Sequence, residues 1–356
     1  MLSLFTTLNG KGKSRFGEIA PRPWLSRHGS RCGPAAGHTI NSTIMPHETT
    51  QALRATLLPH LSVLRAAGPD AVTFLQGQFT NDTRLLHDGS TQLSACNTSH
   101  GRVIAIARLR QTDDAVYALV PADLAAKLIT HLRKFVLRAK VDLVHAHDLQ
   151  VGAIVTVNAD SGAALARIDE GALTMSPVPL SGATEVVTFQ YAPGREIVAA
   201  PPAAWRAISG LSLTRPSPRA ANDWQLADIR DGLPQLSPAT SGQFVPQMLN
   251  LDLIKGVSFT KGCYTGQEIV ARTQHLGRIK RRTLRFRLAA GPAPAPMDGL
   301  YHDGVKLGEV LMTADVGIGA ELLAVTNLDA RSHDLVLEDG RRAVPAELPY
   351  QIGGSD

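Results

Sequence analysis

The hydrophobic pattern changes at Thr283, and this change constrains the fold more than any other feature of the chain. Before it, short apolar runs typical of strands alternate with helical segments, and in the one that starts at Pro121 apolar residues recur three or four positions apart. From Thr283 onwards apolar and polar residues alternate, and two turn signals, Asp303-Gly304 and Asp339-Gly340, separate strand-like runs as in β-hairpins. We therefore expect an α+β body followed by a small all-β barrel or sandwich.

Length and composition set the outer limits. A chain of 356 residues predicts two or three domains, because a single core seldom grows beyond about 250 residues. Hydrophobic residues make up 44% and charged residues 19% of the chain, which excludes general disorder, and no apolar run is long enough to span a membrane. Three cysteines (Cys32, Cys96 and Cys263) lie far apart without a C-x-x-C pair, which indicates free thiols in a reducing compartment.

The net charge of +5 lies entirely in residues 1–44. This segment holds six basic residues and one acidic residue, whereas residues 45–356 hold 30 of each. The basic excess is therefore no sign of a nucleic-acid ligand of the globular part. Because residues 1–44 show neither a helical nor a strand period, we expect a disordered or spurious extension, with Met45 as the natural start. The alternative is an organelle transit peptide, which is also basic and poor in acidic residues.

The pattern divides the rest of the chain into three parts. Residues 45–149 and 219–282 are expected to form one core domain, residues 150–218 an inserted α+β domain, and residues 283–356 the β-barrel domain. Asn222 or Asp223 is expected to cap a helix that contains Trp224 and ends at Gly232.

The segment Lys261–Glu268, K-G-C-Y-T-G-Q-E, is the densest group of candidate functional residues. Thr265 and Glu268 have the spacing of a capping box, so a helix that buries Ile269 and Val270 is expected to begin here. If the preceding loop is extended, Lys261 and Cys263 point to the same side, and a nearby ammonium and a helix N-terminus both favour the thiolate. The alternative is a buried structural cysteine.

Two further patterns are weaker evidence for a functional site. His145 and His147 face one side of a strand, but without a nearby cysteine or carboxylate pair they predict no metal site. The basic run Arg278–Arg282 is the best candidate for an RNA-binding patch. It lacks interleaved aromatic residues and merges into a strand, so a solvated strand edge is the preferred interpretation.

Several segments together resemble the YgfZ family, folate-binding relatives of the glycine-cleavage T-protein. The octet followed by Ile269-Val270-Ala271-Arg272 resembles the signature of this family. The resemblance covers residues 57–345, and four other segments also fit: Phe74–Asp82, Asp228–Pro234, Gly242–Gln247 and Gly277–Arg282.

The resemblance implies a three-domain T-protein-like α+β fold, the aminomethyltransferase folate-binding fold, with a C-terminal β-barrel and a central channel. It implies tetrahydrofolate or a one-carbon derivative as cofactor, and a role in iron–sulfur cluster assembly or repair that affects tRNA modification through iron–sulfur enzymes. Cys263 matches the functional thiol of the family, with Lys261 as its activator. The candidate folate-binding residues are Asn97, Trp224, Arg230, Glu268 and Arg272, and no metal ligand is expected.

The implied partners are folate and iron–sulfur proteins or their assembly machinery, with neither direct nucleic-acid binding nor a membrane. The implied location is the bacterial cytoplasm, or the mitochondrial matrix if residues 1–44 are a transit peptide. For some candidates a plainer role stays open: Trp224 as a core residue, Glu268 as a capping residue, and Arg272 as a solvated helix residue.

Departures from the T-protein pattern bear on activity. The resemblance aligns Ala105 with the T-protein aspartate used on the folate-bound aminomethyl group, and Arg230 with a carboxylate that contacts the pterin. A second tryptophan associated with folate in some members is Leu61 here. These departures argue against the alternative function, a tetrahydrofolate-dependent aminomethyltransferase of the glycine-cleavage type. A tRNA-binding module is a third hypothesis.

Overall fold

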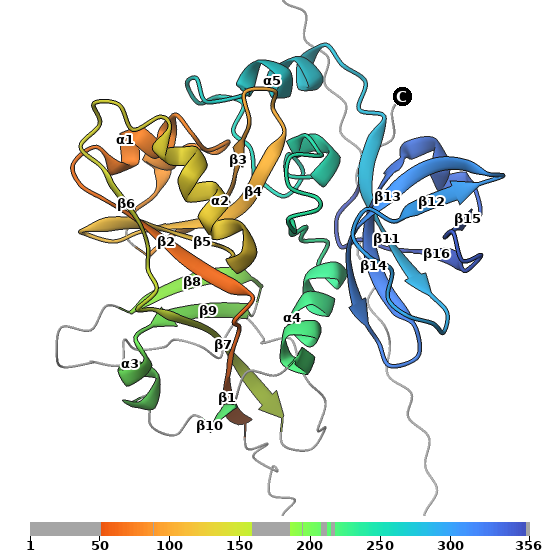
Figure 1. The fold of residues 1–356 in the computed structure, drawn as a ribbon, viewed down its shortest axis with the longest axis horizontal. Helices are drawn as coiled ribbons and strands as arrows, with labels where there is room; N and C mark the ends of the chain where they lie inside the picture. The colour runs from red at the N-terminus through yellow and green to blue at the C-terminus, as the bar shows by residue number, and fades with distance from the viewer. Residues whose placement is uncertain are drawn as a thin grey trace, which may run out of the picture. The chain divides into compact units, whose positions relative to one another are not determined.

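Two five-stranded sheets and a closed barrel organise the chain (Figure 1). The computed structural model describes residues 51–87, 89–158, 186–193, 195–207, 212–214 and 218–353. The expectation for residues 1–44 lies outside the described residues. Among the helices that are described, none is long and apolar enough to cross a membrane.

The first sheet is antiparallel. In spatial order its strands are β3 (Thr91–Asn97), β4 (Val103–Gln111), β5 (Ala115–Pro121), β2 (Leu61–Ala67) and β6 (Asp142–His145). Helices α1 (Ala71–Gln76) and α2 (Ala122–Arg133) pack on one face of it. Helix α2 begins directly after Pro121, as predicted, and buries Leu124, Leu128 and Leu132, which lie four residues apart on one side of a helix.

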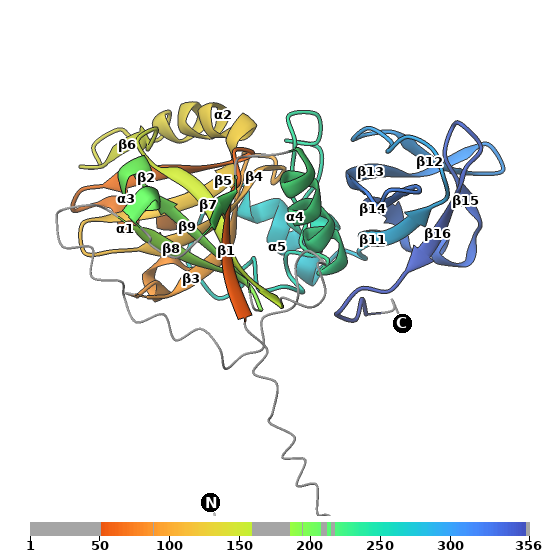
Figure 2. The same ribbon diagram turned by 90° about the horizontal axis from the view of Figure 1, so that it is seen from below.

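The second sheet packs on the other face of the first, so that strands β2 and β5 share a buried apolar cluster with strands β7 to β9 (Figure 2). Its strands are β10 (Ser212–Thr214), β1 (Gln51–Leu57), β7 (Gln150–Asn158), β9 (Arg195–Ala200) and β8 (Val187–Ala192). Helix α3 (Pro202–Ala207) covers its outer face through Ala204 and Trp205. The sheet thus includes residues 51–57 as well as strands from residues 150–214.

Helix α4 (Pro218–Arg230) follows and packs against the barrel strands β13 and β14. The predicted cap at Asn222 or Asp223 is wrong, because proline is well suited to the first turn and the helix begins at Pro218. The Asn222 side chain instead pairs with the backbone of Asp315, accepting from its N–H and donating to its carbonyl, both at 2.8 Å. Gly232, with φ +65°, ends the turn after the helix, as predicted.

The C-terminal strands close into the expected barrel. In order around it they are β11 (Arg281–Leu288), β14 (Ala320–Asn327), β13 (Val305–Asp315), β12 (Gly299–His302), β15 (Leu335–Val336) and β16 (Arg342–Ala346). Both Asp-Gly pairs connect antiparallel neighbours as predicted, β12 to β13 and β15 to β16. Short helical segments η1 (Thr83–Leu85), η2 (Pro246–Leu249) and η3 (Leu328–Ser332) and the helix α5 (Gln267–His275) complete the described elements.

Candidate functional site

Residues 258–266, which we call the thiol loop, lie against the C-terminal end of α1 and are held there by Lys261. The Lys261 side chain is almost fully buried. Its Nζ donates to the backbone oxygens of Gln76 and Phe79 at 2.6 Å each and of Asn81 at 2.8 Å. An ammonium has three N–H donors, and here all three have a main-chain acceptor. Lys261 therefore clamps the loop to the segment that follows α1.

This clamp changes the predicted relation between Lys261 and Cys263. The two side chains do not share a side, because Lys261 is buried and Cys263 is exposed. Burial lowers the pKa of Lys261 to about 8, and the charge of Asp82 opposes that shift. The Tyr264 ring centroid lies 5.0 Å from Nζ. The prediction of a common side is wrong, because the carbonyl groups draw the ammonium inward.

Cys263 itself is open to solvent. A Cβ placed on its neighbour Gly262 would meet no atom within 4 Å, so the approach to the thiol is unobstructed on that side. The alternative of a buried structural cysteine is wrong for Cys263 but fits Cys96, whose burial raises its thiol pKa to about 12. Reactivity of the Cys263 thiol stays a prediction.

The helix after the loop starts without the predicted capping box. Its N-cap is Gly266, which has no side chain, and Gln267 is the first helical residue. The Thr265 side chain lies toward the segment that follows α1: its hydroxyl donates to Gln78 Oε1 at 3.2 Å, and the Thr265 N–H donates to the Gly77 carbonyl at 3.0 Å. The capping-box interpretation is wrong, because the threonine that would close the box is used to fix the loop instead.

Gly266 also brings the loop into contact with the turn between β3 and β4. It has φ +78°, and a Cβ there would lie 2.3 Å from the carbonyl oxygen of Thr98 and 2.8 Å from Gly101 Cα. Gly101 has φ +68°, and a Cβ on it would lie 2.9 Å from Ile269 Cβ. Only glycine fits either position. The two glycines thus set the spacing between the thiol loop, α5 and the first sheet.

Asn97 lies at the base of that same turn. It is the last residue of β3, where the pairing with β4 shifts register, and it is fully buried. Among the residues that the structure describes, neither its amide nitrogen nor its amide oxygen has a hydrogen-bond partner. A buried polar group without a partner is costly and rare in native structures. Asn97 is therefore an unfilled donor–acceptor pair at the base of the turn that Gly266 approaches.

Glu268 and Arg272 lie on α5, and both are exposed. Val270 is the buried residue of this helix, whereas Ile269 is 36% exposed, so the prediction that both residues are buried is wrong for Ile269. The cause is geometric: consecutive helix positions point about 100° apart, and only one of them faces the core.

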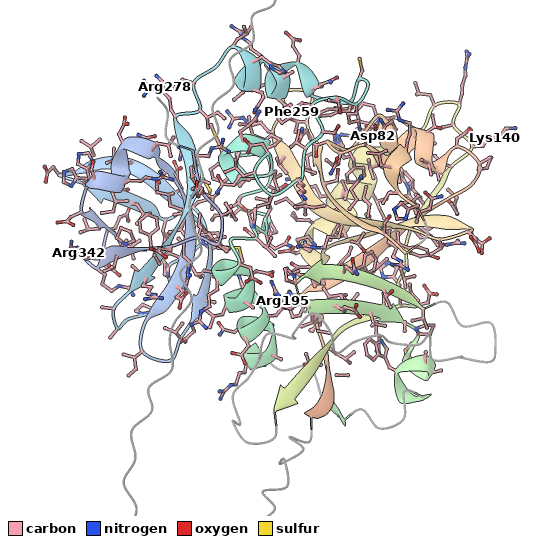
Figure 3. The ribbon with its side chains drawn as sticks, turned by 180° about the vertical axis from the view of Figure 1, so that it is seen from behind. Asp82, Lys140, Arg195, Phe259, Arg278 and Arg342 are labelled. Carbon is pink, nitrogen blue, oxygen red and sulfur yellow. The ribbon has the colours of Figure 1, made fainter. Side chains whose placement is uncertain are left out.

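Trp224 belongs to a different group of residues, which we call the α4 cluster: Arg108, Tyr191, Arg195, Trp224 and Asp228. The guanidinium of Arg195 lies 4.7 Å from the centroid of the Trp224 ring, and Tyr191 meets that ring edge-on at 5.0 Å. With 1% of its surface exposed, Trp224 is a core residue, and its ring is covered by neighbours from the same chain. Figure 3 shows Arg195 at the junction of the second sheet with α4.

Charge is shared within the α4 cluster. Arg195 Nη2 lies 2.8 Å from Asp228 Oδ1 and 2.8 Å from Asp231 Oδ2, and the Tyr191 hydroxyl donates to Asp228 Oδ2 at 2.9 Å. Burial raises the pKa of Asp228, and the two arginines oppose that shift. Within the described part of the chain, Arg195 Nε and Nη1 and the Trp224 indole nitrogen have no hydrogen-bond partner. The sequence pattern did not predict this cluster, although Arg108 within an apolar strand is a signal for it.

Arg230 is engaged by the barrel. Its guanidinium donates to Glu321 Oε1 at 2.8 Å, and Arg285 donates to the other oxygen of the same carboxylate at 2.6 Å. These hydrogen bonds lower the pKa of Glu321 although its partial burial acts in the opposite direction. Arg230 is half exposed and therefore still has one open face. The structure places it with Glu321 on the barrel and not with the thiol loop.

The basic run 278–282 is not a solvated edge throughout. Arg282 is buried and forms a two-pronged ion pair with Asp252, and Arg281 bonds to Glu309. The prediction is therefore wrong for these two residues, because each guanidinium pairs with a carboxylate of the fold. Arg278 and Lys280 remain exposed.

His145 is the last residue of β6 and His147 lies in the turn after it, so the prediction that both lie on a strand is wrong for His147. Both rings have a partner in the fold. His145 bonds to the Ser62 hydroxyl, and its ring centroid lies 3.7 Å from that of His147. Within the described part of the chain, no group of three or more metal-ligating side chains comes together.

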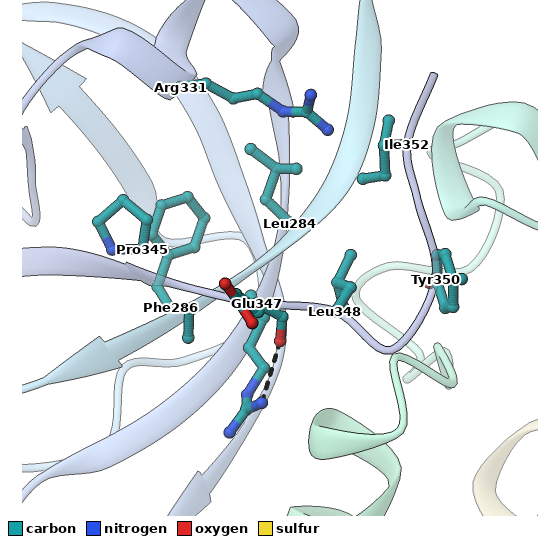
Figure 4. A pocket seen from close by; sticks show the side chains of 10 residues that line it. Leu284, Phe286, Arg331, Pro345, Glu347, Leu348, Tyr350 and Ile352 are labelled. Atoms are coloured by element: carbon teal, nitrogen blue, oxygen red, sulfur yellow. Dashed lines mark hydrogen bonds between the residues drawn. The ribbon is translucent and has the colours of Figure 1, made fainter. Parts of the chain in front are cut away.

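A separate cavity of about 290 Å³ lies at the barrel, between β11 and the segment that follows β16 (Figure 4). Leu284, Phe286, Leu348 and Ile352 supply apolar walls, and the Arg285 guanidinium bonds to the backbone of Glu347 at 3.1 Å. None of the predicted site residues lines this cavity.

The architecture has a solved counterpart. The glycine cleavage system aminomethyltransferase T from Bartonella henselae superposes with a TM-score of 0.63 over 85% of this chain and 86% of that one, at 15% identity. The protein therefore has the three-domain aminomethyltransferase fold with a C-terminal barrel, as predicted.

Sequence comparison gives the family. The chain is 34% identical over 224 residues to the tRNA-modifying protein YgfZ of Colwellia psychrerythraea (63% of this chain, 68% of that protein). It is 30% identical over 295 residues to that of Klebsiella pneumoniae (80% and 89%) and 30% over 240 residues to that of Vibrio atlanticus (67% and 71%). A comparison with protein-family models finds no match. On these relatives, the chain belongs to the YgfZ family.

Proposed function

We propose that this protein binds tetrahydrofolate, or a one-carbon derivative of it, and supports iron–sulfur cluster assembly or repair. Through iron–sulfur enzymes it then serves tRNA modification, the activity named for its relatives. The observation that carries the proposal is the unfilled amide of Asn97, at the base of the turn that the fixed thiol loop touches through Gly266. The family and the fold, which it shares with a folate-related enzyme class, support the same proposal.

The residues around Asn97 are compatible with a pterin. A pterin ring presents hydrogen-bond donors and acceptors side by side along one edge, and a carboxamide offers one of each. The buried amide of Asn97 supplies this pair and has no partner of its own. Of the charged candidates, exposed Arg272 is suited to pair with the carboxylates of the glutamate tail. Glu268 lies one helical turn before Arg272 on α5.

Trp224 and Arg230 fit the folate role less well. The Trp224 ring is covered by Arg195 and Tyr191, which leaves it a packing role in the α4 cluster. Arg230 reaches a ligand only with the face that Glu321 leaves open. Asn97 is therefore the strongest of the folate-binding candidates.

Cys263 is proposed as the functional thiol, acting by thiolate chemistry or as a transient ligand. Lys261 is a positioning residue in this proposal, because its ammonium hydrogens are used by three carbonyl groups and hold the loop that carries Cys263. The exposure of the thiol supports a reaction with a partner that arrives from solution, such as an iron–sulfur protein or its assembly machinery. Free cysteines at positions 96 and 263 support a reducing compartment such as the cytoplasm.

Aminomethyl transfer is the weaker alternative. The position aligned with the T-protein aspartate is Ala105, fully buried opposite Cys96 in the first sheet. A methyl side chain can neither accept a proton nor stabilise a cation. We expect no glycine-cleavage turnover with a lipoyl carrier protein, and measurable turnover would establish the alternative.

Two measurements test the proposal. Calorimetry with tetrahydrofolate should detect binding to the wild type and a loss of at least about tenfold in affinity for Asn97→Leu, since two hydrogen bonds disappear. In a deletion strain, iron–sulfur enzyme activity and tRNA methylthiolation should be restored by the wild type and by Cys96→Ala but not by Cys263→Ala. Wild-type rescue by Cys263→Ala would contradict the assigned role of the thiol. Absence of tetrahydrofolate binding to the wild type would contradict the proposal that the protein binds folate.

A further inference from the structure

The outer side of α5 combines positive charge with exposed apolar side chains next to the thiol loop. Figure 1 shows α5 beside the turn between β3 and β4, in agreement with the close approach of Gly101 to Ile269. We define the α5 face by six residues of this helix, the turn and the following segment: Arg102, Ile269, Arg272, His275, Leu276 and Lys280. All six are exposed, and of the two apolar residues Ile269 is 36% and Leu276 is 85% exposed.

The charge of this face differs from that of the globular part as a whole. Residues 45–356 carry equal numbers of basic and acidic residues. On the α5 face three basic residues are exposed: Arg272 on the helix, Arg102 on the turn, which also donates to the Gln243 carbonyl, and Lys280 where the following segment reaches the barrel. Exposed Glu268 is the acidic residue of α5. Cys263 lies four residues before the helix begins, with open space beside Gly262. The thiol loop adjoins the N-terminal end of α5, and Leu276 follows its C-terminal end, so a partner that spans the whole helix reaches the thiol.

The apolar residues distinguish a protein partner from a nucleic acid. Leu276 and Ile269 offer contact area that a phosphate backbone does not use, whereas protein interfaces combine an apolar centre with a polar rim. The basic run that would follow a phosphate backbone is interrupted, since Arg281 and Arg282 are paired with Glu309 and Asp252. Phe259 is half-buried and packs edge-on against His275, so it does not serve as a stacking platform.

We propose that the α5 face is a docking surface for an acidic protein, which it binds through apolar contact with Leu276 and charge pairing with its basic residues. The docked partner covers Cys263. The face shares Arg272 with the folate candidates, so the test of this inference uses Leu276 and Lys280, neither of which is a folate candidate.

The test uses the full chain and three fluorescent probes of equal charge: an amphipathic peptide of glutamate and leucine, poly-L-glutamate, and a uridine oligonucleotide. Fluorescence anisotropy should show that the peptide binds at least about tenfold more tightly than the other two, because it alone offers both kinds of contact. Bound peptide should slow alkylation of Cys263 by iodoacetamide about fivefold or more, read at that residue by mass spectrometry.

A matched pair of variants locates the surface. Leu276→Glu with Lys280→Glu should weaken peptide binding at least about tenfold. Ile318→Glu with Arg287→Glu makes the same exchange at exposed residues of the barrel and should stay within about twofold. Both variants should keep the tetrahydrofolate affinity of the wild type, so a wild type without folate binding would affect the proposed function and not this inference.

Three results would overturn the proposal. One is binding of polyglutamate or of the oligonucleotide as tight as that of the peptide. Another is an equal loss of affinity in the barrel variant. The third is unchanged alkylation of Cys263 when the peptide is bound.

Discussion

The thiol loop and the α4 cluster both contain buried cations, but they satisfy them by opposite means. Lys261 donates to three main-chain carbonyl groups. Arg195 pairs with the side chains of Asp228 and Asp231, and two of its nitrogens have no hydrogen-bond partner among the described residues. The first arrangement ties a lysine to the path of the backbone and leaves the thiol free in solvent. The second ties several side chains to one another inside the core.

The difference indicates that the α4 cluster serves mainly stability and the thiol loop mainly function. A substitution in the α4 cluster leaves a charge without its partner in a low-dielectric interior, so its main effect should be on the free energy of unfolding. A substitution in the thiol loop should alter how the loop lies on α1 and on the turn between β3 and β4. Four sets of variants distinguish these two roles.

The largest effect is expected for Arg195→Met. Removal of the guanidinium leaves Asp228 buried without a counter-charge and should lower the free energy of unfolding by about 3–5 kcal/mol. Urea unfolding measures this loss. The control is Arg195→Met with Asp228→Asn, which removes the charge but keeps an acceptor for the Tyr191 hydroxyl and should recover part of the loss. A single variant as stable as the wild type would show that the cluster is not a stabilising unit.

Next comes Gly266→Ala, compared with Gly262→Ala. An alanine at position 266 adopts a left-handed conformation and directs its Cβ into the Thr98 carbonyl, which should cost about 2–4 kcal/mol through backbone strain and overpacking. An alanine at position 262 meets open space and should stay within about 0.5 kcal/mol of the wild type. Thermal and urea unfolding of both variants provide the comparison. Equal costs would contradict the close approach of loop and turn.

The third prediction concerns pH and Lys261→Met. The Lys261 pKa is about 8 in the folded protein against an ordinary value of 10.5, so between these pH values the unfolded chain binds more protons. The free energy of unfolding of the wild type relative to Lys261→Met should therefore rise as the pH increases from 8 to 10.5. Below pH 8 the lysine is protonated in both states and the difference should be flat. Urea unfolding at pH 7.5 and 10 checks the sign, and a falling difference would contradict the burial of the ammonium.

The smallest effect is expected for Thr265→Ala and Glu268→Ala taken together. The two side chains do not form a capping box, so their coupling in a double-mutant cycle should be below about 0.3 kcal/mol. Glu268→Ala alone should cost about 0.3–1 kcal/mol at low salt, since its carboxylate lies in the first turn of α5. A coupling near 1 kcal/mol, measured by thermal unfolding, would restore the capping box.

Local signals in the sequence predicted much of the fold. The Asp-Gly turns and the alternation after Thr283 identify the barrel because both arise from neighbouring residues. The start of α2 after Pro121 was predicted for the same reason. The pairing of β1 with β10 and β7 was not predicted, because these strands lie more than 90 residues away in the sequence. The sequence of a short strand does not indicate which strands it pairs with.

The candidate site likewise combines features that local sequence predicts with features that depend on distant residues. The octet identified Cys263 as a candidate, and its exposure agrees with a reactive role. The contacts of Lys261, Thr265 and Arg282 could not be predicted, because their partners are carbonyl and carboxylate groups brought together by the tertiary fold. The unfilled amide of Asn97 is likewise visible only when its surroundings are known.

Tyr350, near the end of the described chain, contacts residues from the middle of the sequence. Its hydroxyl donates to the Gly232 carbonyl at 2.7 Å and accepts from Asn250 at 3.3 Å, and its ring occupies the space that a side chain at Gly232 would need. During synthesis the turn after α4 emerges from the ribosome well before this partner does. The connection between α4 and the thiol loop must therefore wait for almost the whole barrel before its last contacts can form, which makes the C-terminal segment the step that completes folding.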